Sequence, residues 1–101
     1  RVPGRDGGKR KQRHIAWRKQ ATHAVDDPSQ LPGELVSIRL ACAYGESAAE
    51  CIYRFDQRIA PLGVHYFAEL HGTRLWSVFT IKVSADIAAN VNAIVAKLNE
   101  R

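Results

Sequence analysis

The sequence contains no methionine, only two cysteines and no long apolar run. Without a run of about 18 apolar residues, it has no candidate membrane span. Cys42 and Cys51 are not spaced as a C-x-x-C redox or zinc motif. We expect two buried free thiols there, with a disulfide between them as the alternative. The missing methionine, even at position 1, leaves two alternatives for the chain: a processed product or a fragment of a longer protein.

Motifs of catalysis are also missing. The sequence has no P-loop, dinucleotide fingerprint, zinc spacing or nucleophile elbow. His14 and His23 stand apart from His65 and His71, and six residues of strand would separate the latter two by about 20 Å. His71 beside Glu69 is a weak candidate for catalysis, and two solvent-facing polar side chains are the simpler interpretation. We therefore expect no enzymatic activity, no cofactor and no metal site.

Charge is unevenly distributed along an otherwise ordinary composition. The chain has 101 residues, of which 46% are apolar and 25% charged, typical of one globular domain. Residues 1–23 carry eight basic side chains and one acidic side chain, for a net charge of +7. Residues 24–101 carry seven basic and nine acidic side chains, for a net charge of −2. This pattern indicates a basic arm on a mildly acidic body. We also expect the protein to be cytoplasmic.

The arm and its linker are predicted to span residues 1–30, and the folded domain residues 31–101. The stretch "RVPGRDGGKRKQR" has too few apolar residues to fold alone, and "DDPSQLPGE" is typical of a linker. Such an arm would neutralise phosphates of a nucleic acid with little sequence preference. A solvated tail and contact with an anionic membrane surface are the alternatives. The candidate nucleic-acid contacts are Lys9, Arg10, Lys11, Arg13, Arg18, Lys19 and Trp17, whose ring would either stack or act as an anchor.

The body begins with a strand and a helix. Apolar residues alternate with other side chains in "LVSIRLACAY", which predicts a half-buried strand from Leu35. Ser47 is a plausible N-cap of the helix that follows, and Pro61 ends it. Glu50 and Arg54 are spaced to form an i, i+4 ion pair on this helix. Its apolar stripe consists of Ala48, Ile52, Phe55, Ile59 and Leu62.

The rest of the body predicts a hairpin and a second helix. Two strand-like runs flank Gly72 in "VHYFAELHGTRLWSVFTIKV", and "SADIAANVNAIVAKLNER" has a helical apolar face. The order β-α-β-β-α predicts an α+β, ferredoxin-like two-layer sandwich with an antiparallel sheet and two helices on one face. The usual fourth strand is missing. Three alternatives are open for this strand. It was cut from a longer chain, another chain supplies it, or the segment around Ile15 to Trp17 takes its place at the edge of the sheet.

Residues 35–98 resemble the ACT domain family of small regulatory modules. The resemblance rests on "LVSIRLACAYGE", "RIAPLGVHYFAEL" and "IVAKLNER". It implies a non-enzymatic regulatory domain that pairs with another copy through sheets or helices. It also implies a small-ligand site, for an amino acid, in the first strand-to-helix loop at Tyr44, Gly45 and Glu46.

Two helices on one face would leave the other face of the sheet open. The alternation predicts that this face presents Phe67, Trp76 and Val78, with Arg39 and Lys82 as a rim. Self-association through this face, or its cover by the arm, is the leading interpretation. Stacking of unpaired bases on the aromatic rings is one alternative, and a different protein partner is another.

Overall fold

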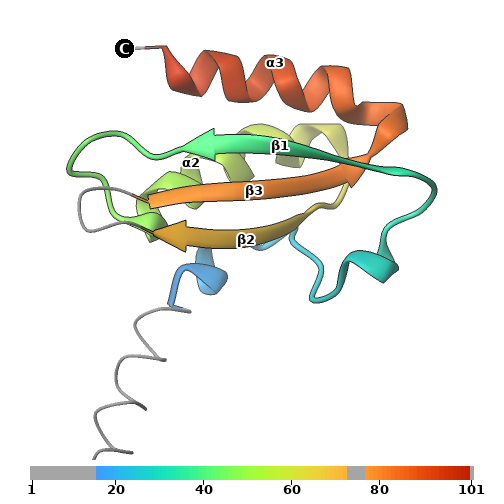
Figure 1. Cartoon of the computed structure of the whole chain (residues 1–101), viewed down its shortest axis with the longest axis horizontal. Coiled ribbons are helices and arrows are strands. Elements are labelled where there is room, and N and C mark those ends of the chain that lie inside the picture. The colour runs from blue at the N-terminus through green and yellow to red at the C-terminus, as the bar shows by residue number, and fades with distance from the viewer. Residues whose placement is uncertain (1–15, 73–76, 101) are drawn as a thin grey trace, which may run out of the picture.

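The computed structural model describes residues 16–72 and 77–100. In this part of the chain, three strands and two α-helices follow the predicted order β-α-β-β-α. The strands are β1 (Leu35–Ala41), β2 (Phe67–Gly72) and β3 (Ser77–Ser84), and the helices are α2 (Ala48–Ile59) and α3 (Ala88–Asn99). Short 3-10 turns are η1 (Ala16–Gln20), η2 (Pro28–Gln30), η3 (Ala60–Leu62) and η4 (Ala85–Ile87). The α+β class with an antiparallel sheet is therefore confirmed (Figure 1).

The described strands form one sheet in the order β1-β3-β2. Both outer strands are antiparallel to β3, so they run parallel to each other with β3 inserted between them. Ile38 and Ala68 both lie opposite Ile81, and Arg39 and Glu69 both lie opposite Thr80. Such a crossover needs a long connection between the parallel strands, and α2 supplies it.

Local signals set the bounds of α2. The Ser47 hydroxyl accepts from the Glu50 amide at 3.1 Å, and the Glu50 carboxylate accepts from the Ser47 amide at 3.1 Å. This capping box confirms Ser47 as the N-cap. At the other end, Pro61 lies in η3, and Gly63 takes a left-handed φ of 68° that ends the turn. Neither α2 nor any other helix of the described segments is both long and apolar enough to cross a membrane.

The core lies on one face of the sheet. Every fully buried strand residue belongs to that face, and the buried residues of both helices join the same cluster. Aromatic side chains hold its centre: Phe55 meets Tyr66 edge-on at 4.9 Å, and Trp17 meets Phe79 edge-on at 5.0 Å between ring centroids. Edge-to-face pairs of this kind add about 0.5–1.5 kcal/mol beyond the area they bury.

The segment from Ala16 to Leu31 is folded onto the body. Trp17 and Ala21 belong to the core cluster, and η1 packs against α2. Ala24 forms a parallel bridge with Tyr66, and the Val25 amide donates to the Tyr66 carbonyl at 2.7 Å. The sequence predicted an arm and linker over residues 1–30, which includes all of this segment except Leu31. The described packing instead extends the folded unit to Ala16, because Trp17 and Ala21 cover apolar surface that the sheet and α2 leave open.

Candidate functional site: a charged pocket and an open sheet face

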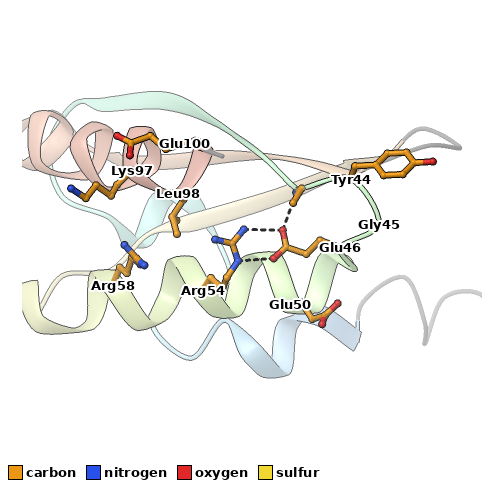
Figure 2. Close-up of a pocket in the computed structure, with 10 residues that line it drawn as sticks. Tyr44, Gly45, Glu46, Glu50, Arg54, Arg58, Lys97, Leu98 and Glu100 are labelled. Atoms are coloured by element: carbon orange, nitrogen blue, oxygen red, sulfur yellow. Dashed lines mark hydrogen bonds and ion pairs between the residues drawn. The ribbon is translucent and has the colours of Figure 1, made fainter.

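The loop between β1 and α2 is a tight turn over the end of the sheet. The Cys42 amide donates to the Ser77 carbonyl at 3.0 Å, and the Glu46 amide donates to the Ala43 carbonyl at 2.9 Å. Gly45 has a φ of 79°, a left-handed conformation that favours glycine. The turn directs the Glu46 side chain back toward α2, whereas the Tyr44 ring is 83% exposed and points away (Figure 2).

Glu46 forms a two-point ion pair with Arg54. The Arg54 Nε and Nη2 donate to the Glu46 carboxylate at 2.6 and 2.9 Å, and the Ala43 amide donates to the same carboxylate at 2.9 Å. The hydrogen bond with Glu46 raises the pKa of Arg54, against an opposing effect of burial. The sequence paired Arg54 with Glu50. That expectation is wrong, because the Glu50 carboxylate is used in the capping box and the turn brings Glu46 to Arg54.

The ion pair lies in a surface pocket of about 540 Å³ (Figure 2). The pocket is bounded by the β1–α2 loop, α2 and the end of α3. Besides the pair itself, it carries two exposed cations, Arg58 and Lys97, and the carboxylates of Glu50 and Glu100. This mixture suits a small molecule with groups of both signs, because each charge of such a ligand has an opposite charge on a wall of the pocket. The predicted loop, Tyr44, Gly45 and Glu46, therefore does line a pocket.

Two buried thiols flank this loop: Cys42 begins it, and Cys51 lies near the start of α2. No disulfide joins them. A hydrogen bond with Cys42, followed by burial, raises the pKa of the Cys51 thiol, which keeps it protonated and unreactive. Of the two expectations for these cysteines, the structure shows buried thiols without a disulfide.

The second candidate site is the face of the sheet opposite the core. None of its described side chains is fully buried. Phe67, Val78 and Lys82 lie here half-buried, and Arg39 is exposed. Lys82, expected at the rim, lies on the central strand β3. Beside Val78 a shallow hollow of about 410 Å³ runs across the strands between Arg39 and His71. The predicted contact Trp76 lies outside the described residues.

The predicted nucleic-acid contacts are only partly described. Lys9, Arg10, Lys11 and Arg13 lie outside the described residues, while Arg18 and Lys19 are exposed on η1. Trp17 is 6% exposed. The Arg18 guanidinium lies over its ring at 5.5 Å from the centroid. Of the two roles expected for Trp17, this placement is that of an anchor in the core.

Sequence reasoning missed a buried polar cluster around Asp56. Asp56 is 1% exposed, yet its carboxylate accepts from the Thr22 hydroxyl at 2.6 Å, the Tyr66 hydroxyl at 2.7 Å and the His23 amide at 2.9 Å. The His23 ring Nδ1 lies 3.0 Å from the same carboxylate. The available signal was the spacing of Asp56, four residues after Ile52 and three before Ile59, within the apolar stripe of α2.

Burial and hydrogen bonds within the cluster shift the pKa values of Asp56 and Tyr66. Burial alone would raise the pKa of Asp56, but hydrogen bonds from Thr22, the His23 amide, Tyr66 and the His23 ring outweigh it and lower the pKa. Burial and the hydrogen bond to Asp56 raise the pKa of Tyr66. The cluster joins the N-terminal segment to α2 and to the start of β2. Among the described residues, no group of three or more His, Cys, Asp or Glu side chains is arranged to hold a metal.

No protein-family model, curated protein or solved structure shows significant similarity to this chain. The resemblance to the ACT family accordingly stays a prediction.

Proposed function

We propose that this chain is a small, non-enzymatic regulatory or assembly module that self-associates through the open face of its sheet. The observation that carries the proposal is the difference between the two faces. One face holds the whole strand contribution to the core, and the other leaves Phe67 and Val78 half-buried beside a shallow hollow. Apolar surface on an uncovered sheet face favours a partner surface.

The same proposal gives the pocket beside Glu46 a role in ligand binding, as the ACT resemblance implies. Glu46 and Glu50 suit an ammonium group, and Arg58 and Lys97 suit a carboxylate. Thermal unfolding with free amino acids, and with the matching amines that lack a carboxylate, tests this role. We expect only the amino acids to raise the unfolding temperature, and Arg58→Ala to abolish the shift. Equal shifts with the amines would contradict a carboxylate site.

A ferredoxin-like topology is part of the proposal. The position of β3 between two parallel strands supports it. The fourth strand of that fold would lie against the outer edge of β1, where the described residues provide no strand.

Solution mass by light scattering, at low and high salt, tests self-association directly. We expect a dimer of the full chain, and we expect Val78→Arg to give monomers, because it places a charge in the centre of the contact. Ala93→Arg adds the same charge on an exposed position of α3 and should leave the dimer intact. A monomeric wild-type chain would refute the proposal.

Nucleic-acid binding through the arm is the second candidate. Eight basic side chains among the first 23 residues favour it, and Arg18 and Lys19 are exposed. Replacing Lys9, Arg10, Lys11 and Arg13 with Ala should weaken binding to a generic duplex and reduce its salt dependence, without changing the solution mass. Loss of both properties together would show that arm and sheet form one site.

A further inference from the structure

The open face is a grid of three strands and three rows. Residues directly opposite each other in antiparallel strands point to the same face. The register therefore gives three rows from β1 across β3 to β2: Ser37–Lys82–Phe67, Arg39–Thr80–Glu69 and Ala41–Val78–His71. The middle row carries a cation on one outer strand and an anion on the other.

These two charges are unpaired within the described parts of the chain. Arg39 and Glu69 are both exposed, and neither takes part in an ion pair with another described residue. Thr80 lies between them, and two strand spacings separate their backbones by about 10 Å. A second surface that presents an anion opposite Arg39 and a cation opposite Glu69 would satisfy both groups.

We propose that a second copy of the chain is this surface, packed face to face about a two-fold axis that runs along β3. In that arrangement β1 of one copy lies over β2 of the other. Arg39 then meets Glu69 of the second copy, and the same contact repeats on the other side of the axis. Thr80 and Val78, which both lie on β3, meet their own counterparts along the axis. Two packed sheets keep their strands within about 30° of each other, which this axis allows.

The charge pattern selects this axis over the other two-fold axis in the plane of the contact. An axis across the strands, through the middle row, would place β1 over β1 and β2 over β2. Arg39 would then face Arg39, and Glu69 would face Glu69. Like charges in such contact oppose association, so only the axis along β3 makes the face complementary to itself.

Lys82 gives the arrangement a distinctive property. Because it lies on β3, it faces its own counterpart near one end of the contact. Its long side chain can carry the ammonium group outward, so the contact survives, but the like charges weaken it. Removing this charge with Lys82→Gln should strengthen the dimer, whereas a partner surface of opposite charge would predict weaker association.

Charge exchange between two variants tests the pairing, which rests on the proposed self-association. Arg39→Glu or Glu69→Arg alone places like charges in both contacts, and we expect each to weaken the full-length dimer by at least about tenfold. Mixing the two variants aligns opposite charges again, so an equimolar mixture should form a heterodimer of near wild-type affinity. Lys19→Glu, on exposed η1, changes the net charge by the same amount as Arg39→Glu and should leave the dimer unchanged.

The outcomes separate the two proposals. Native mass spectrometry distinguishes the heterodimer from either homodimer, and thermal unfolding of each variant shows that it is folded. A wild-type dimer that tolerates both single variants, or variants that stay monomeric when mixed, would overturn the Arg39–Glu69 contact while leaving self-association in place. A monomeric wild-type chain at every concentration would overturn both.

Discussion

Asp56 and Glu46 are carboxylates at opposite ends of α2, and both accept several hydrogen bonds. Asp56 is 1% exposed, and its donors come from the N-terminal segment and from Tyr66. The Glu46 side chain is 13% exposed, and its donors are a neighbouring loop amide and Arg54, on the wall of an open pocket. A buried carboxylate surrounded by donors holds segments together. A carboxylate at a pocket wall can also be approached by a ligand from solvent.

Removing the buried carboxylate should have the largest effect. Asp56→Ala removes the shared acceptor of the Thr22 and Tyr66 hydroxyls and the His23 amide, and it leaves the Tyr66 hydroxyl unsatisfied in the core. We expect the free energy of unfolding to fall by about 3 kcal/mol or more. Urea denaturation measures it, with Asp86→Ala on exposed η4 as the control. A loss below about 1 kcal/mol would mean that the cluster does not hold the N-terminal segment.

Acidification should remove part of the same stabilisation. The folded-state pKa of Asp56 is lowered from 3.8, so the unfolded chain takes up a proton first as the pH falls. The contribution of Asp56 is therefore complete above about pH 4, its unfolded value, and is lost as the pH drops through the lower folded value. Urea denaturation at pH 7, 4 and 3 should show a smaller acid loss in Asp56→Ala than in the wild type. Parallel pH curves for the two proteins would contradict this assignment.

Removing one donor of the cluster, the Tyr66 hydroxyl, should reduce stability less than removing the Asp56 carboxylate that accepts from it. Tyr66→Phe removes one hydrogen bond to Asp56 but keeps the ring that meets Phe55 edge-on. We expect a loss of about 1–2 kcal/mol in the free energy of unfolding. In a double-mutant cycle with Asp56→Ala the two effects should not add, because both remove the same bond. Additive losses would show that Tyr66 acts through packing alone.

The pocket carboxylate should contribute least to stability. Glu46→Gln weakens a pair in which the Arg54 side chain is 37% exposed, so we expect a loss below about 1 kcal/mol. Its main effect should be on binding of an amino acid, whose ammonium group loses an acceptor. Calorimetric titration and urea denaturation of the same variant separate the two effects. A large loss of stability with unchanged binding would reverse the comparison between Glu46 and Asp56.

The sequence predicted what depends on neighbours along the chain. The strand from Leu35, the Ser47 cap and the order of elements follow from short-range periodicity and capping. The loop at Tyr44 to Glu46 was named through the resemblance to the ACT family, and only its position between the strand and the helix follows from local patterns. Arg58 and Lys97 were not assigned to this pocket, because only the packing of α3 against α2 brings them to the same wall.

The interactions of Trp17 and Asp56 depend on contacts between distant parts of the chain. Trp17 stands among basic residues, so composition suggested an arm, and only the apolar surface beside Phe79 accounts for its burial. Asp56 breaks an apolar stripe, but its donors lie 10 to 34 residues away in the sequence. Local patterns carry no information about such partners.

The attachment of the N-terminal segment has a consequence for the order of events during synthesis. Thr22 and His23 leave the ribosome before their acceptor Asp56, which follows them by 34 and 33 residues, and before the strand edge at Tyr66. Closing a loop of this length costs more chain entropy than forming a local turn or hairpin. This segment is therefore expected to stay undocked until α2 and Tyr66 have emerged and folded. Until it docks, the indole of Trp17 and the carboxylate of Asp56 remain in water, within reach of chaperones and proteases.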